Sequence, residues 1–182
     1  DQGSSRQVAG MQELLPMEKW LGITANPPLA AGTAAKFLWI RENEPEKYEK
    51  CRHLLLPKDY IRYVLTGVFA TDVSDATGMQ MLDVRNRCWS DEVLDALKID
   101  RSILGRLYES QEVTGYLLPE IAQECGLSTK TAVVAGGSDN ACAAVGTGIV
   151  RAGQAVVTLG TSAVGSTRFD TSVRVPAGGL NV

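Results

Sequence analysis

Histidine and paired cysteines are scarce in this 182-residue sequence, and this restricts the metal and redox chemistry open to it. The one histidine is His53, and the four cysteines, at positions 51, 88, 125 and 142, form no C-x-x-C pair. Structural zinc sites need closely spaced cysteine or histidine ligands, so we expect no metal site built from these side chains. The cysteine pattern is typical of reduced thiols, which predicts a cytoplasmic protein.

Long apolar runs and clusters of positive charge are also missing. No apolar stretch approaches the roughly eighteen residues that span a bilayer, and no cationic leader precedes a hydrophobic segment, so we expect neither membrane insertion nor secretion. A net charge of −3 without a long basic run argues against nucleic acid as a partner. The chain has 45% apolar and 21% charged residues, which is the composition of a globular domain.

One carboxylate stands out because of where the pattern places it. Residues 133–135 form a short apolar run that closes on Gly136 and Gly137, which predicts a buried strand ending in a tight turn. The Ala-rich run after Asp139 predicts a helix, so Asp139 would lie at a helix N-terminus, at the carboxyl end of a strand. Open α/β sheets bind ligands there. The alternative is that Asp139 only caps the helix, which contributes about 1 kcal/mol, and position alone does not separate the two.

A second glycine turn follows. Residues 155–159 and 163–167 predict two strands joined by Gly160, Thr161 and Ser162. Gly160 lets a ligand approach the backbone closely, and two hydroxyls with consecutive N–H groups can hold phosphate oxygens. The same three residues are also typical of an ordinary hairpin. Together with the turn that carries Asp139, they indicate a candidate phosphoryl-transfer site.

The order of these motifs resembles that of the FGGY carbohydrate kinases. The similarity is carried by GGSDNA and GTG within residues 136–148 and by TLGTS at residues 158–162. Upstream it is carried by LLLPKDYIRYVLTG at residues 54–67 and ATDVSDATG at residues 70–78. The resemblance covers nearly the whole chain, and several motifs occur in the family's order.

The resemblance implies a phosphoryl transfer from ATP, used with Mg²⁺, and gives roles to four residues. Asp139 matches the catalytic aspartate that accepts the proton of the attacking sugar hydroxyl, and Asn140 adjoins the sugar pocket. Gly160 and Thr161 match the family's second phosphate loop, while no side chain is assigned to a metal. The amino-acid sequence of these motifs favours D-xylulose as the substrate, with its 5-hydroxyl accepting the phosphoryl group. Ribulose, gluconate and glycerol are the alternative substrates. The resemblance is also compatible with a homodimer.

The resemblance further implies an α/β fold of the ribonuclease-H-like, actin-like ATPase type, with two domains of this kind. Residues 1–148 match the later, sugar-binding part of the first domain, and residues 149–182 match the first strands of the second, nucleotide-binding domain. The family's first phosphate loop, Asp-x-Gly-Thr or Asp-x-Gly-Ser, and its adenine-binding segments have no counterpart here. We therefore expect an internal piece of a longer kinase, inactive by itself.

Local signals predict further elements. The expected elements are helices over residues 33–43, 58–65, from a Ser90 cap to residue 97, and 119–125, and a short strand over residues 53–56. In the helix over residues 58–65, the apolar side chains at positions 60, 61, 64 and 65 are expected to face inward. Lys58 and Asp59 are expected to form a solvated first turn rather than part of a pocket. Asp72 and Asp75 suggest a metal pair, but local capping explains them more simply.

The spacing of glycine and serine residues excludes two other enzyme classes. A Rossmann dehydrogenase needs G-x-G-x-x-G, but Arg151 occupies the position of the third glycine. A serine hydrolase needs G-x-S-x-G, and neither Ser138 nor Ser162 is followed by glycine two residues later. The remaining alternative is a sugar-binding or regulatory fragment that keeps the pocket without transferring phosphate. A phosphorylation assay separates that alternative from a kinase.

Overall fold

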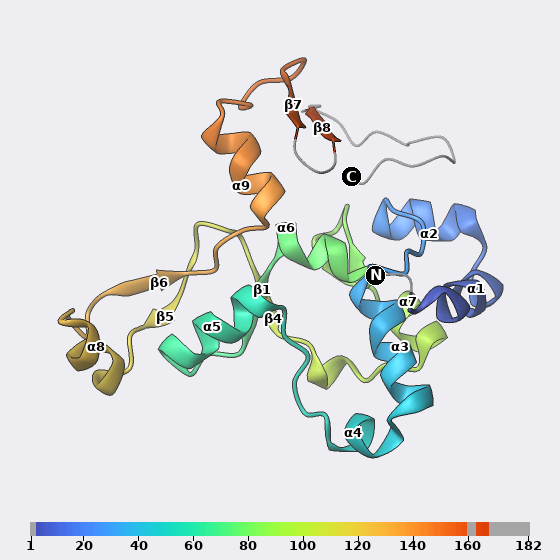
Figure 1. The fold of residues 1–182 in the computed structure, drawn as a ribbon, viewed down its shortest axis with the longest axis horizontal. Helices are drawn as coiled ribbons and strands as arrows, with labels where there is room; N and C mark the ends of the chain where they lie inside the picture. The colour runs from blue at the N-terminus through green and yellow to red at the C-terminus, as the bar shows by residue number, and fades with distance from the viewer. Residues whose placement is uncertain (1–2, 160–162, 168–182) are drawn as a thin grey trace.

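The computed structural model describes residues 3–159 and 163–167 (Figure 1). Five short α-helices precede the first strand, and short strands and helices are interspersed after it. The α-helices are α1 (Ser5–Leu14), α2 (Met17–Thr24), α3 (Thr33–Asn43), α4 (Pro45–Lys50), α5 (Pro57–Thr66), α6 (Val73–Ala76), α7 (Asp91–Leu97), α8 (Pro119–Cys125) and α9 (Asp139–Gly146), with 3-10 helices η1 (Thr77–Met79) and η2 (Arg101–Ile103). The strands are β1 (Ala70–Asp72), β2 (Leu82–Asp83), β3 (Cys88–Trp89), β4 (Arg106–Tyr108), β5 (Val113–Tyr116), β6 (Ala132–Val134), β7 (Ala155–Leu159) and β8 (Ala163–Thr167).

The main hydrophobic core lies among α1, α2, α3 and α7. It includes two tryptophans, Trp20, which is fully buried, and Trp89, which is 5% exposed. The indole N–H of Trp20 donates to Met11 O at 3.2 Å, and that of Trp89 donates to Gly105 O at 2.9 Å. Both tryptophans are therefore buried without losing a hydrogen-bond partner for their polar edge.

Four helices expected from the sequence are confirmed. Helix α3 has the predicted bounds, and α5 ends at Gly67, whose φ of +69° places it in the left-handed region. Ser90 caps α7 because its Oγ accepts a hydrogen bond from Val93 N at 3.2 Å. Helix α8 begins at Pro119 and ends before Gly126, which is also left-handed with φ +67°.

The described strands pair two at a time. Strand β1 runs parallel to β4, and the pairs β2–β3, β5–β6 and β7–β8 are antiparallel. The β7–β8 ladder extends from the pair Ala155–Thr167 to the pair Leu159–Ala163, so the two predicted strands are confirmed. The residues that join them, 160–162, lie outside the described part of the chain.

The expected strand over residues 53–56 is wrong. The described backbone makes only an isolated parallel bridge there, from Leu54 to Leu104. Pro57 begins α5 immediately afterwards, which leaves too few residues for an extended ladder.

Helix α5 is oriented opposite to the prediction. Tyr60 and Ile61 are 56% and 59% exposed, whereas Asp59 and Arg62 are buried. The Arg62 guanidinium contacts Asp59 and donates to the main-chain carbonyl of Ala70, which begins β1. The predicted inward apolar face is therefore wrong, because α5 docks through hydrogen-bonded polar side chains. Figure 1 shows α5 beside β1.

Helix α9 ends at Gly146, and β7 begins at Ala155. The domain boundary expected between residues 148 and 149 lies in the segment between them and stays a prediction. None of the helices in the described residues combines the length and the apolar character that crossing a bilayer requires.

Candidate active site

Asp139 is the first residue of α9, directly after the turn that follows β6. Ser138 is the N-cap of this helix, since its Oγ accepts a hydrogen bond from Ala141 N at 3.3 Å. The predicted placement of Asp139 between a strand and a helix is confirmed, and the alternative that it serves as the cap is wrong. The expected burial of the strand is also wrong, because Ala132 and Val134 of β6 are exposed and β6 pairs only with β5 among the described strands. Asp139 Oδ1 accepts from Asn140 N at 2.7 Å, and both side chains are exposed. The carboxylate is thus accessible to a ligand.

Hydrogen bonds attach this turn to two other parts of the chain. Gly136 N donates to the main-chain oxygen of Ser110, between β4 and β5, at 3.0 Å. Ser138 N donates to Ser74 Oγ, in the first turn of α6, at 3.0 Å. The position of the turn is therefore set by these two segments rather than by β6 alone.

The structure explains why glycine occupies both positions of the turn, 136 and 137. Gly136 has φ +78°, a left-handed conformation that glycine adopts at little cost. Gly137 is closely packed: a Cβ at this position would lie 3.0 Å from Cys142 Sγ and 3.3 Å from the hydroxyls of Ser74 and Ser110. Close packing on this side leaves the turn little freedom to move.

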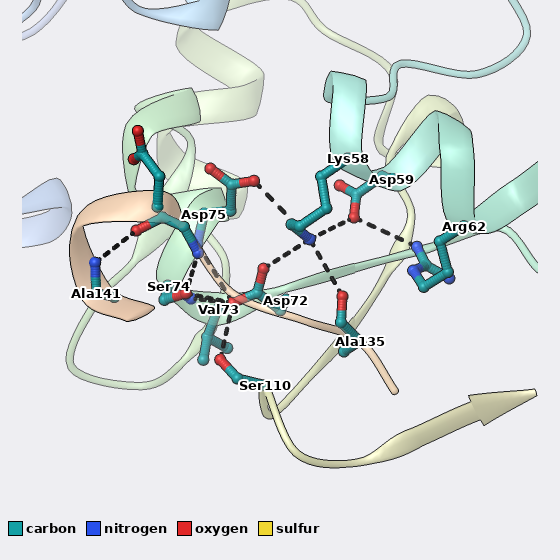
Figure 2. A network of polar contacts seen from close by, with 12 residues as sticks. Lys58, Asp59, Arg62, Asp72, Val73, Ser74, Asp75, Ser110, Ala135 and Ala141 are labelled. Carbon is teal, nitrogen blue, oxygen red and sulfur yellow. Dashed lines mark hydrogen bonds and ion pairs between the residues drawn. The ribbon is translucent and has the colours of Figure 1, made fainter. Parts of the chain in front are cut away.

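Lys58 lies at the centre of a cluster of carboxylates next to the turn, as Figure 2 shows. Its Nζ is 2.7 Å from Asp59 Oδ1, 2.9 Å from Asp72 Oδ1 and 3.8 Å from Asp75 Oδ2. It also donates to the main-chain oxygen of Ala135 at 3.2 Å. Asp59 and Asp72 are fully buried. One ammonium group therefore links α5, the end of β1, α6 and the residue before the glycine turn.

The charges of this cluster shift the pKa values of two of its members, Lys58 and Asp75. Burial lowers the pKa of Lys58, but hydrogen bonds to Asp59 and Asp72 and their negative charges outweigh it, so the pKa of the ammonium is raised. Burial raises the pKa of Asp75, Lys58 opposes this rise, and the negative charges of Asp72, Asp59 and Asp139 add to it. Asp139 is therefore close enough to Asp75 for the two charges to interact.

Sequence reasoning missed this cluster. The expectation that Lys58 and Asp59 form a solvated first turn is wrong, because the Asp59 side chain is 1% exposed and that of Lys58 is 28% exposed. The signal that could have found Asp59 is the polar spacing of α5, where Asp59, Arg62 and Thr66 recur at i, i+3 and i+7 on one buried face. Lys58 gives no such signal, since most of its partners come from other elements.

Asp72 caps α6, as predicted. Its Oδ2 accepts from Ser74 N at 2.9 Å and from Asp75 N at 3.4 Å. The same oxygen accepts from the hydroxyls of Ser74 at 2.5 Å and Ser110 at 3.1 Å. Among the residues that the structure describes, no group of three or more histidine, cysteine, aspartate or glutamate side chains is placed to hold a metal ion.

A cavity of about 150 Å³ lies beside the same network and is lined in part by Ser74, Ser110 and Arg87. The two serine hydroxyls donate to Asp72. Arg87 donates to both carboxylate oxygens of Glu109, at 2.6 and 2.5 Å. The cavity therefore lies next to the carboxylate that caps α6.

The structure places two of the four predicted site residues. Asp139 and Asn140 are adjacent in the first turn of α9. Gly160 and Thr161 lie outside the described residues, between β7 and β8. Their assignment to nucleotide binding stays a prediction.

Structural comparison identifies the class of protein. The structure matches the crystal structure of a xyloylose kinase from Brucella ovis with a TM-score of 0.85 and 37% sequence identity. The match covers 91% of this chain and 34% of that one. The predicted α/β fold of the actin-like ATPase type is thereby confirmed.

The chain belongs to the FGGY family of carbohydrate kinases, whose N-terminal domain model matches residues 1–146. It is similar to the xylulose kinases of Escherichia coli, at 50% identity over 142 residues, and of Bacillus subtilis, at 44% over 144 residues. These matches cover 78% and 79% of this chain and 29% of each relative. The chain thus spans less than a third of the length of these relatives.

Proposed function

We propose that the protein to which this segment belongs transfers the γ-phosphoryl group of MgATP to the 5-hydroxyl of D-xylulose. Membership of the FGGY family supports the phosphorylation of a sugar, and the 50% identity with a xylulose kinase supports the choice of sugar. The observation that carries the proposal is the exposed Asp139 carboxylate at the N-terminus of α9 in a chain of this family. The 182-residue segment alone is expected to be inactive.

In this mechanism Asp139 is the general base. The sugar hydroxyl oxygen bonds to the γ-phosphorus, the bond from that phosphorus to the bridging oxygen of ADP breaks, and the hydroxyl proton passes to Asp139. The transition state is loose, so the proton moves late and the base contributes on the order of 10²- to 10⁴-fold. Asn140 follows Asp139 with an exposed side chain and is proposed to contact the sugar.

The nucleotide side of the site is proposed from the sequence. Gly160 and Thr161 would approach the phosphates of ATP through main-chain N–H groups and a hydroxyl. Mg²⁺ enters as part of MgATP and stabilises the charge that spreads over the phosphoryl oxygens. The four cysteines are free thiols, which supports a cytoplasmic reaction. The homodimer stays a prediction.

The test is an ADP-release assay on the full-length protein with D-xylulose, ribulose, gluconate and glycerol as acceptors. We expect kcat/KM to be highest for D-xylulose, with phosphate on the 5-hydroxyl by NMR of the product. The Asp139→Asn variant should bind MgATP but form little product. Sugar binding without phosphorylation would instead favour the non-catalytic alternative. Phosphorylation of another sugar with higher kcat/KM would correct the substrate.

A further inference from the structure

We propose that Lys58 is a positioning residue for phosphoryl transfer, which holds the turn presenting Asp139 by binding the Ala135 carbonyl. This inference rests on the proposed function and adds to it a residue that does not touch the substrate. The Lys58 Nζ lies 3.2 Å from Ala135 O, at the last residue before the Gly136-Gly137 turn. Lys58 acts on the reacting groups through the backbone.

The contacts of the ammonium fit this role. Lysine has three N–H donors, and three oxygens lie within 3.2 Å of Nζ: one each from Asp59, Asp72 and Ala135. Two of these are the negative charges of buried carboxylates, and the third is the carbonyl of a residue that is 1% exposed. The carboxylates lie on α5 and at the end of β1, so Lys58 connects the turn to two elements of fixed position.

Lys58 also contacts a part of the turn that Ser74 and Ser110 do not bind. Main-chain N–H groups of Gly136 and Ser138 are bound by Ser110 and Ser74. Lys58 binds a carbonyl instead, and its aliphatic stem packs against the turn, since a Cβ at Gly136 would lie 3.3 Å from Lys58 Cδ. Without Lys58, the turn would keep its N–H contacts but lose this carbonyl contact and part of its packing.

Lys58 affects the electrostatics of the turn as well. The titratable groups around it are Asp59 and Arg62 on α5, Asp72 at the end of β1, Asp75 on α6, and Asp139 with the Cys142 thiol on α9. Lys58 is the cation that contacts three of these carboxylates. Removing its charge takes away the cation that opposes the raised pKa of Asp75, so Asp75 becomes easier to protonate. An acidic limb in the pH profile of kcat should therefore move to higher pH.

The experiment uses the full-length kinase and compares Lys58→Met with Lys58→Arg and with Lys130→Met. Lys130 is an exposed lysine between α8 and β6 and is not one of the groups around Lys58, so its variant should keep wild-type kinetics. We expect Lys58→Met to lower kcat by roughly 10-fold with KM for ATP within about 3-fold, because the groups that bind nucleotide are not displaced. Its acidic limb should shift to higher pH.

Lys58→Arg should restore the acidic limb because it keeps the positive charge. It should recover kcat only in part, because a planar guanidinium does not place three donors around one point. A purely structural role would lower the melting temperature and kcat of Lys58→Met but leave the acidic limb in place. That result, or a Lys58→Met variant with kcat within 2-fold of wild type, would overturn the proposal.

A second variant covers the case in which Lys58→Met does not fold. In the double variant Lys58→Met/Asp72→Asn, one positive and one negative charge are removed together, and asparagine still caps α6. We expect this protein to fold and to keep the reduced kcat, whereas full kcat would contradict the positioning role. If the wild-type enzyme phosphorylates no sugar, the proposed function fails. If it does and the Lys58 variants match it, only this inference fails.

Discussion

The main-chain N–H of Ser138 donates to the hydroxyl of Ser74 at 3.0 Å, across 64 positions of sequence. Ser138 caps α9 and Ser74 lies in the first turn of α6, so this bond joins the beginnings of two helices. The Ser74 hydroxyl in turn donates to Asp72, which caps α6. The orientation of Asp139, next to Ser138, is therefore tied to the end of β1.

Ser74→Ala should uncouple these helices. We expect the free energy of unfolding to fall by about 1–2 kcal/mol, because a largely buried N–H and a carboxylate both lose a partner. We also expect kcat of the full-length kinase to fall several-fold. Ser110→Ala is the comparison, since its hydroxyl packs near Gly137 and donates to Asp72 but has no hydrogen bond to the turn. Equal kcat in the two variants, measured beside urea unfolding, would contradict the link from Ser74 to Asp139.

Asp139→Asn in the full-length kinase should leave ATP affinity within a few-fold and lower kcat by roughly 10²-fold or more. The amide keeps the shape of the side chain but does not accept the proton. Steady-state turnover and nucleotide titration measure the two quantities. Near-normal turnover would show that Asp139 is not the base, and Asn140→Ala, expected to raise KM for the sugar, checks the neighbouring position.

Asp59→Ala should strongly destabilise the protein. Asp59 is buried and contacts both Lys58 and Arg62, so its removal leaves two cations without this carboxylate. We expect a loss of about 3–5 kcal/mol in the free energy of unfolding, which is typical of breaking a buried pair. Arg101→Ala is the control: its pair with Asp91 is exposed, and we expect a change within about 1 kcal/mol. Similar losses from the two variants in denaturant titration would contradict the buried network.

Stability should depend on pH through Asp75. A carboxyl group whose folded pKa is raised stabilises the folded state below its unfolded pKa of 3.8, and this contribution is lost as pH rises through the folded value. Asp75→Asn does not ionise, so its free energy of unfolding relative to wild type should rise over that pH window. If the free energy of unfolding of Asp75→Asn differs from that of the wild type by a constant amount between about pH 3 and about pH 7, the raised pKa of Asp75 is contradicted.

Gly105→Ala should disrupt the pairing of β1 with β4. A Cβ at Gly105 would lie 2.8 Å from the carbonyl carbon of Ala70, and a backbone atom cannot turn aside as a side chain can. We expect a loss of more than about 2 kcal/mol by urea unfolding. Gly22→Ala is the matched control: it lies within α2 with nothing within 4 Å of its Cβ position, so alanine should stabilise by about 0.5–1 kcal/mol. The prediction fails if both variants change stability in the same direction.

Local signals in the sequence were sufficient for helices α3, α5, α7, α8 and α9 and for the placement of Asp139, but α1, α2 and α4 were not predicted. Gly67, Ser90 and Gly126 act through their own backbone or through a residue three positions away, so their effects are readable in sequence. Strand β6, which ends at Val134 shortly before Gly136, and the helix that begins at Asp139 follow from the same kind of short-range pattern.

The contacts of Lys58 could not be predicted in this way. Its partners Asp72 and Ala135 are 14 and 77 positions away, and no periodicity relates them. The apolar residues of α5 were misleading, because hydrophobicity predicts which face is buried only when nothing else binds more specifically. Here the Arg62–Asp59 pair and its carbonyl partners determine the orientation of the helix.

The hydrogen bonds around Asp139 also limit how genes of this family can recombine. The residues that hold its turn, Lys58, Asp72, Ser74 and Ser110, all lie upstream of it within one stretch of chain. A chimera of two sugar kinases with its crossover between residues 58 and 139 would separate at least one of these anchors from the turn that it holds. Crossovers before residue 58 or after residue 139 exchange the carboxylate and its supports as one unit, and so keep its geometry intact.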